Sequence, residues 1–259
     1  MNILFIGDIV GRAGRRAIRK LLPDIQKDYN IDLTVANGEN SAGGFGITED
    51  VYNELLDYNI DCLTMGNHTW KNKDIYNFID TQDKLIRPLN FLPGTPGKGW
   101  TVFNVNNFSI AVINMIGTIY MGNYQPPLFV LEKKLPEIKN KSDFIVLDFH
   151  AEATGEKLAF AHALTGKIAT VAGTHTHIQT ADARILPGGT GYISDLGLTG
   201  AMDSILGMKK TGVIKKYRTQ MPARFKVGTG QVQLEGAVFK INPKNGNTRA
   251  VKTVHRTDS

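Results

Sequence analysis

The sequence predicts a single α/β domain, residues 1–259, in which two β-sheets form a sandwich between outer helices. Three observations support this prediction. The chain has 259 residues, of which 42% are hydrophobic, enough for one sizeable core. Its first half alternates short apolar runs with amphipathic stretches, as in strands joined by crossover helices. Its end contains two long alternating runs around a turn, which is typical of an antiparallel pair.

The first half of the chain predicts a largely parallel sheet with helical connections. Apolar runs predict strands at residues 3–6, 33–36 and 62–65. Residues 14–29 predict a helix, because apolar side chains recur at helical spacing and basic side chains occupy the other face. A glycine-rich loop follows the second strand, and Thr48 with two acids after it is typical of a helix start.

The second half predicts a hairpin, a strand–helix–strand unit and the final antiparallel pair. Asn106-Asn107 separates two alternating runs, and such a dipeptide favours a hairpin turn. A helix containing Glu156, Leu158 and Ala161 lies between two apolar strands. The predicted strands are residues 101–105, 108–116, 144–149, 169–172, 231–241 and 248–255.

Composition favours a cytoplasmic enzyme. The first residues lack a basic region and reach Asp8 after a few apolar side chains, which argues against a signal peptide. No apolar run approaches the roughly 20 residues that span a bilayer. Cys62 is the only cysteine, which excludes an internal disulfide and thiolate metal clusters.

The formal charge of +6 is unevenly distributed along the chain. Residues 205–259 contain 12 Lys or Arg and 2 Asp or Glu, a local excess of +10, so the remaining residues sum to −4. A basic segment beside an acidic metal-binding region would attract phosphate-bearing ligands, including nucleic acid. A solvated lysine-rich surface explains the same charges, and both interpretations stay open.

Side chains of metal-ligand types follow five predicted strands at their carboxyl ends. They are Asp8, Glu39, Asn40, Asn67, His68, His150, His175 and His177. Ligands of open α/β sheets bind outside the carboxyl ends of the strands, so these side chains can converge on one edge. A glycine directly precedes Asp8, Glu39 and Asn67, and glycine lets the backbone turn sharply towards a ligand.

Each residue alone also has an ordinary explanation, since a polar group after a strand can satisfy loop backbone and a single histidine is commonly structural. The joint pattern favours a metal site. Its donors are carboxylates, amide oxygens and imidazoles, which suit Mn, Fe, Co or Zn. The seven predicted ligands, all of these residues except His68, are too many for one tetrahedral zinc but suit two metals with a bridging carboxylate. Glu39 is the predicted bridge.

Two motifs resemble those of the calcineurin-like metallophosphoesterases: Gly-Asn-His at residues 66–68 and Gly-Thr-His-Thr-His at residues 173–177. This resemblance implies a four-layer αββα sandwich, two mixed sheets flanked by helices, with a binuclear site. The chain departs from the superfamily pattern at three points. Asp-Ile-Val at residues 8–10 lacks the first histidine, Glu39 replaces the bridging aspartate, and Thr69 follows Gly-Asn-His.

These departures are similar to the YmdB-like branch of the superfamily. The similar motifs are Gly-Asp-Ile-Val-Gly at residues 7–11, Asn-Gly-Glu-Asn at 37–40, Gly-Asn-His-Thr at 66–69, His-Ala-Glu-Ala at 150–153, Gly-Thr-His-Thr-His-Ile-Gln-Thr-Ala-Asp at 173–182 and Leu-Pro-Gly-Gly-Thr at 186–190. The resemblance runs essentially from end to end. The ordered combination is highly specific.

The resemblance implies a role for each residue of the set. The first metal would be held by Asp8, Glu39, Asn40 and His177, and the second by Glu39, Asn67, His150 and His175. Asn40 then occupies the position left open by the missing first histidine. Glu39 and His68 are the predicted catalytic residues, and His68 looks like the substrate-side histidine of the superfamily.

The resemblance also implies hydrolysis of phosphodiesters, with 2′,3′-cyclic nucleotides such as 2′,3′-cyclic AMP as substrates, and a role in RNA turnover and regulation. The predicted reaction is in-line attack by a hydroxide that bridges two ions, Fe or Mn, with Zn or Co as alternatives. His68 would protonate the leaving oxygen. No Gly-Lys-Ser or Gly-Lys-Thr phosphate loop occurs in the sequence, which argues against motor chemistry on nucleoside triphosphates.

Two other functions stay open at this point. One is a metal-loaded regulatory module that binds RNA or a protein and hydrolyses phosphoesters only incidentally. The other is a phosphomonoesterase or nucleotidase, because the metal core would be shared. Lys157, His162 and Arg184 are predicted to be structural. The sequence leaves the oligomeric state open, a homo-oligomer included.

Overall fold

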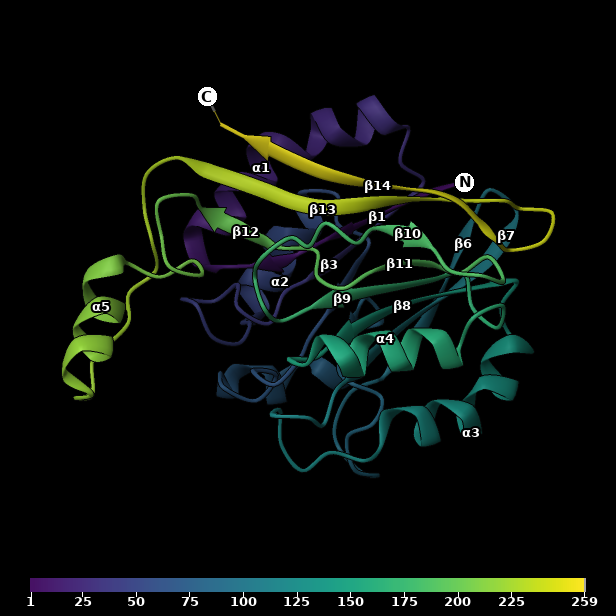
Figure 1. Cartoon of the computed structure of the whole chain (residues 1–259), viewed down its shortest axis with the longest axis horizontal. Coiled ribbons are helices and arrows are strands. Elements are labelled where there is room, and N and C mark those ends of the chain that lie inside the picture. Colours follow the sequence, from purple (N-terminus) through teal and green to yellow (C-terminus); the bar gives the residue numbers. More distant parts are fainter. Residues whose placement is uncertain (259) are drawn as a thin grey trace.

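Two mixed β-sheets lie face to face between two layers of helices in the computed structural model, which describes residues 1–258 (Figure 1). Helices α1 (Gly11–Tyr29) and α2 (Glu49–Asp57) cover the first sheet. Helices α3 (Pro127–Lys139) and α4 (Thr154–Ala163) cover the second. This arrangement confirms the four-layer αββα sandwich.

The first sheet has eight strands in the order β2-β12-β13-β1-β3-β4-β5, with β14 paired to β13. Strands β1, β3, β4 and β5 run parallel, and β13 lies antiparallel to β1. Their bounds are β1 (Asn2–Ile6), β2 (Asp8–Ile9), β3 (Leu33–Asn37), β4 (Cys62–Thr64), β5 (Leu85–Ile86), β12 (Leu198–Ala201), β13 (Val232–Ile241) and β14 (Thr248–Thr257). The carboxyl ends of the parallel strands therefore meet at one edge.

The second sheet has six strands in the order β10-β11-β9-β8-β7-β6. Strands β7, β8, β9 and β11 run parallel. Their bounds are β6 (Trp100–Val105), β7 (Phe108–Ile116), β8 (Phe144–His150), β9 (Thr170–Thr174), β10 (Arg184–Ile185) and β11 (Gly191–Ile193). The predicted hairpin is confirmed as β6 and β7, and Asn106 and Asn107 both adopt the positive φ that a tight hairpin turn needs.

Strand β1 illustrates why the predicted strands are apolar runs rather than alternating ones. Leu4 and Ile6 pack into the cluster under α1 and α2, whereas Ile3 and Phe5 pack into the cluster between the sheets. Successive side chains of a strand point to opposite faces, so a strand covered on both sides must be apolar throughout. A third cluster fills the space between the second sheet and α3 and α4.

Most predicted elements are confirmed within a few residues. Helix α2 starts after Thr48, whose side chain accepts a hydrogen bond from Val51 N at 3.3 Å. Helix α1 begins at Gly11, three residues before the predicted start, because its first turn buries the small residues Gly11, Ala13 and Gly14, which give no apolar periodicity to detect. None of the helices within residues 1–258 combines the length and apolarity needed to cross a bilayer.

Several elements have no counterpart among those predicted from the sequence. Besides short strands, they are α3, the 3₁₀ turns η1 (Lys73–Asn77) and η2 (Ile79–Thr81), and α5 (Lys210–Thr219). Proline obscured α3, although Pro127 lies in its first turn, where proline is tolerated. Helix α5 has no buried residue and therefore no apolar stripe to detect, and it stands away from the body of the molecule in Figure 1.

Candidate metal centre

The carboxyl ends of five strands bring the seven predicted ligands to one edge of the sandwich. Strands β1, β3 and β4 of the first sheet lead into Asp8, Glu39, Asn40 and Asn67. His150 ends β8, and His175 and His177 follow β9, so the imidazoles come from the second sheet. The site thus joins oxygen donors of one sheet to nitrogen donors of the other.

Glu39 lies at the centre of this arrangement and is almost fully buried. Its Oε1 is 3.1 Å from His150 Nε2 and 3.3 Å from His68 Nδ1, and its Oε2 accepts a hydrogen bond from His68 N at 2.8 Å. Oε1 is buried without a hydrogen-bond partner of its own. A buried carboxylate oxygen left in this way is costly unless a cation compensates it.

One ligand group surrounds His150. Its Nε2 is 3.0 Å from His175 Nδ1 and 2.9 Å from Asn67 Oδ1. Ligand atoms of Glu39, His150 and His175 all lie within 4.8 Å of one another. Imidazole nitrogens and oxygens that converge on one point fit a transition-metal ion.

A second ligand group surrounds Asp8, which is fully buried. Its Oδ1 is 3.6 Å from His177 Nε2, and its Oδ2 accepts a hydrogen bond from His175 N at 3.0 Å. Asn40 turns its amide nitrogen towards Asp8, at 3.5 Å, and towards His177, at 3.3 Å. Ligation through the amide oxygen of Asn40 therefore needs a half-turn of that group.

The loop after β9 carries two histidines in a strained conformation. His175 and His177 have φ values of 103° and 63°, which non-glycine residues rarely adopt. Such strain is concentrated at functional sites, where surrounding contacts enforce it. Here the enforced geometry turns both rings towards the carboxylates.

Electrostatics in the centre favour ionised carboxylates. Burial raises the pKa of Glu39, but His150 and His68 outweigh it and hold the pKa well below its usual range. Burial lowers the pKa of His150, yet Glu39 reverses the effect and raises it to about 9. Burial and neighbouring His150 lower the pKa of His175 to about 4. His175 is therefore a neutral imidazole. His150 carries a proton, which a metal cation would displace on binding.

A buried polar network orients His150. Its Nδ1 lies 2.9 Å from Thr174 Oγ1, and Thr174 donates to Asp148 Oδ1 at 2.7 Å. Asn37 Nδ2 donates to Asp148 Oδ2 at 3.2 Å. Such outer contacts fix a ligating ring with the other nitrogen towards the metal. Sequence reasoning missed these residues, although a charged residue at 148 inside an apolar run was a visible signal.

A buried ion pair supports the loop that carries His175 and His177. Lys157 Nζ donates to Asp195 Oδ2 and to Thr174 O, each at 2.9 Å. Asp195 Oδ2 also accepts from Thr176 N at 2.9 Å. The structure thus agrees with a structural role for Lys157. His162 and Arg184 are exposed and do not line the pocket of the metal centre.

The pocket above these residues has a volume of about 280 Å³. Its lining is Glu39, Asn40, His68, Glu152, His175, Thr176, His177 and Leu206. Glu152 Oε2 lies 3.1 Å from His175 Nε2. The half-exposed ring of Phe45 lies edge-on to His68 with 5.0 Å between centroids. Glu152 was visible beforehand only as part of the His-Ala-Glu-Ala motif, and Phe45 gave no signal.

Known proteins are similar to this chain in sequence and in fold. The chain is 45% identical over 252 residues, 97% of this chain and 95% of the relative, to the 2′,3′-cyclic-nucleotide 2′-phosphodiesterase of Bacillus subtilis (strain 168). The crystal structure of a phosphatase from Mycoplasma pneumoniae superposes with a TM-score of 0.93 at 31% identity, covering 99% of this chain and 93% of that one. A Staphylococcus aureus structure named as a 5′-nucleotidase matches with a TM-score of 0.62 at 14% identity, covering 98% and 54%, which shows a common fold alone.

The predicted fold class is confirmed by these similarities, since the 5′-nucleotidase neighbours have the metallophosphoesterase fold. The model of the YmdB-like protein family matches residues 4–254, nearly the whole chain. Together with the 45% identity to the Bacillus enzyme, this match shows that the chain belongs to the YmdB-like protein family.

Proposed function

We propose that this chain, acting as one domain over residues 1–259, is a metal-dependent phosphodiesterase that opens 2′,3′-cyclic nucleotides such as 2′,3′-cyclic AMP. The observation that carries the proposal is the buried Glu39 carboxylate, whose Oε1 lacks a hydrogen-bond partner amid converging imidazoles. Membership of a family that contains a 2′,3′-cyclic-nucleotide 2′-phosphodiesterase supports this substrate class.

The ligands divide into two sets that meet at Glu39. Asp8, Glu39, Asn40 and His177 would hold the first ion, with Asn40 presenting its oxygen after a half-turn of the amide. Glu39, Asn67, His150 and His175 would hold the second. Oxygen and nitrogen donors suit Fe or Mn, with Zn or Co as alternatives. When bound, the two ions would activate a water for in-line attack and neutralise charge on the phosphoryl oxygens.

His68 is placed to act on the substrate side. Its Nδ1 faces the metal ligands, 2.7 Å from the side chain of Asn40 and 3.3 Å from Glu39 Oε1. Nε2 is then the nitrogen left for the substrate, and the ring lines the pocket. Opening the cyclic diester breaks one P–O bond, and the departing ribose oxygen needs a proton that His68 would supply.

The pocket wall supports a nucleotide over a small phosphoester. Phe45 is 42% exposed and Leu206 45% exposed, so both offer apolar surface beside His68 and the metal ligands. An aromatic ring at this position can stack against a nucleobase, a contact that tolerates any base. We therefore expect broad acceptance of the four bases.

A phosphomonoesterase is the second candidate, because a structure with a TM-score of 0.93 is named as a phosphatase. Hydrolysis profiled over 2′,3′-cyclic nucleotides, linear diesters and monoesters separates the two. We expect the cyclic diesters to be preferred and the 3′-phosphate to be the product, as the name of the Bacillus relative describes. Preferred release of inorganic phosphate from monoesters would assign the chain to the second class instead.

The proposal also places the enzyme in the cytoplasm. Support comes from Cys62, the one cysteine of the chain, which is a buried free thiol. Burial raises the pKa of the Cys62 thiol, so it stays protonated and unreactive. A protein without disulfides is typical of a reducing compartment.

A further inference from the structure

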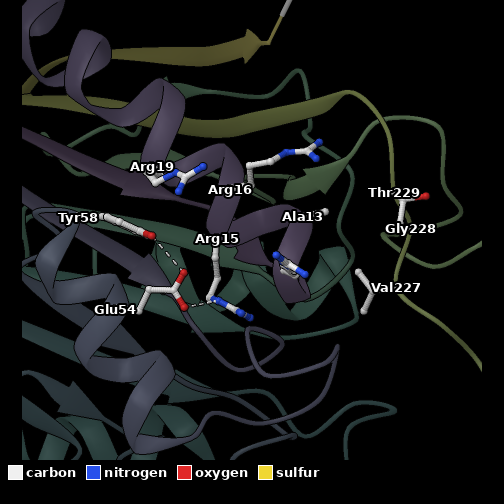
Figure 2. A pocket seen from close by; sticks show the side chains of 10 residues that line it. Ala13, Arg15, Arg16, Arg19, Glu54, Tyr58, Val227, Gly228 and Thr229 are labelled. Atoms are coloured by element: carbon white, nitrogen blue, oxygen red, sulfur yellow. Dashed lines mark hydrogen bonds and ion pairs between the residues drawn. The ribbon is translucent and has the colours of Figure 1, made fainter.

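A second pocket, rich in arginine, lies along α1, between the end of α2 and residues 227–229 (Figure 2). Its volume is about 460 Å³. It is lined by Arg12, Ala13, Arg15, Arg16 and Arg19 of α1, by Glu54 and Tyr58 at the end of α2, and by Val227, Gly228 and Thr229. The arginines are spaced at i, i+3, i+4 and i+7, which places them in a row along one side of the helix. At 1.5 Å per residue the row covers roughly 10 Å.

Most of this positive charge has no partner among residues 1–258. Within this part of the chain, Arg15 is the one pocket arginine that forms an ion pair, between Nε and Glu54 Oε2 at 2.7 Å. Arg12 and Arg19 are exposed and make neither a hydrogen bond nor an ion pair with residues 1–258. Arg16 reaches Gly230 O through Nη2, while its Nε is buried without a hydrogen-bond partner. The pocket therefore has an excess of positive charge and unused N–H donors.

The arginine pocket and the metal centre are connected by the same segments of chain. Arg15 Nη1 donates to Ser41 O at 2.7 Å, and Ser41 directly follows Asn40. Gly11 N donates to Asn40 O at 2.8 Å. On the other side, Met208 pairs with Val227, which lines the arginine pocket, while Leu206 lines the metal pocket. Adjacent residues of the chain therefore border both pockets.

The lining indicates which ligand chemistry fits. Planar guanidinium groups bind phosphate through paired hydrogen bonds, and a row of about 10 Å exceeds one phosphate group. Ala13, Val227 and the ring of Tyr58 add apolar surface for a sugar or base. The basic segment 205–259 borders the pocket through Val227 and strengthens the attraction for a polyanion. These features match the backbone of a single-stranded nucleic acid rather than a free phosphate ion.

We propose that the arginine pocket binds the sugar–phosphate backbone of a short oligoribonucleotide whose 3′-terminal 2′,3′-cyclic phosphate lies at the metal centre. This inference rests on the proposed activity at that centre. It extends the substrate class from cyclic mononucleotides to RNA fragments with cyclic ends. The upstream phosphates would then contribute to binding while the chemistry at the terminal phosphate stays the same.

The test compares two substrates and four proteins. The substrates are 2′,3′-cyclic AMP and a pentaribonucleotide with a 2′,3′-cyclic end. The proteins are the wild type, Arg12→Gln/Arg19→Gln, Arg12→Lys/Arg19→Lys and the control Arg249→Gln, which changes an exposed arginine on β14. Because Arg12 and Arg19 are exposed and unpaired, the variants should fold, which circular dichroism and the thermal midpoint check.

For the wild type we expect a lower KM for the pentanucleotide than for cyclic AMP. The glutamine variant should raise the KM of the pentanucleotide roughly tenfold, a loss of about 1.4 kcal/mol. It should leave cyclic AMP hydrolysis unchanged. The salt dependence of pentanucleotide binding should flatten by about 1.4 in slope, at about 0.7 per phosphate contact on a single strand. The lysine variant should keep the slope, and Arg249→Gln should match the wild type.

Binding of a fluorescent pentanucleotide with a 3′-phosphate separates this inference from the proposed function, because it requires no turnover. If cyclic AMP is not hydrolysed but this binding still depends on Arg12 and Arg19, the proposed activity is wrong and RNA binding by the arginine pocket is supported. Equal binding to the wild type and the glutamine variant overturns the proposal that the arginine pocket binds RNA. So does a loss of cyclic AMP hydrolysis in that variant, or inorganic phosphate binding as tightly as the pentanucleotide.

Discussion

The metal centre and the α5 segment are both rich in charged side chains, yet they differ in burial. Asp8, Glu39 and His150 are at most 1% exposed, and each lies within hydrogen-bonding or ion-pairing distance of others. Helix α5 has no buried residue, and Tyr217 on it is 88% exposed. Buried charges interact strongly at short range, whereas exposed charges act through a field that salt screens within about 10 Å at 0.1 M. Burial, rather than the number of charges, therefore identifies the reactive region.

The largest effect is expected from Glu39→Gln. The substitution keeps the side-chain size but removes the negative charge that both ion sites share, so bound metal and activity should both collapse. Metal analysis should find two transition-metal ions per wild-type chain and fewer in the variant. The control is Glu132→Gln on the outer surface of α3, which should keep metal and activity. A fully active wild type with one ion or none per chain would refute the two-metal assignment.

His68→Ala separates metal binding from catalysis within the metal centre. Metal content should stay nearly intact, while the catalytic rate on a cyclic nucleotide should fall by roughly 10²- to 10⁴-fold if His68 supplies general acid catalysis. The loss should shrink for a nitrophenyl phosphodiester, whose leaving group needs less help from a proton. His162→Ala on α4 is the matched control. Equal losses on both substrates would rule out a leaving-group acid, as would complete loss of metal.

Lys157→Met tests the support beneath the metal ligands. The variant leaves Asp195 buried without its cation, which typically costs about 3–5 kcal/mol of stability. Denaturant unfolding should show a loss of this size, together with weaker metal binding, because Thr174 and Thr176 lose part of their anchor. Lys139→Met on the exposed end of α3 should change neither. An unchanged midpoint would mean that the loop after β9 does not depend on this ion pair.

The smallest effect is expected from α5 and its N-cap residue, because their charges are exposed. Reversing the charges of Lys209, Lys210, Lys215 and Lys216 should lower activity only at low substrate concentration, and only in low salt, because exposed charges mainly change encounter rates. Stopped-flow or steady-state rates over a salt series measure this. If rate and salt dependence both stay unchanged, the segment is a solubilising surface. A loss of metal would mean that α5 is coupled to the site.

The arginine pocket lies between these two extremes. Its side chains are half-buried or exposed, but α1 and residues 227–229 hold them in one concave surface. The basic face of α1 is visible in the sequence, but the pocket is not. The second wall comes from a segment more than 200 residues away in the chain, and only packing brings the two together.

The layered α/β class, most strands and the set of candidate ligands can be read from the sequence alone. Apolar runs and helical periodicity are local properties, and a polar residue after a parallel strand must lie at its carboxyl end. The side-chain types of Glu39 and His150 likewise limited the chemistry before any contact was known. These conclusions needed only residue spacing and donor type.

The contacts between distant side chains follow only from the folded structure. Asn37 bonds Asp148 across 111 positions, and Lys157 pairs with Asp195 across 38, so neither contact follows from local pattern. The strained backbone of His175 and the unpartnered oxygen of Glu39 also arise from packing the two sheets together. Periodicity depends on residues that are neighbours in the chain. The burial of a side chain and the residues that it contacts depend instead on how distant elements pack.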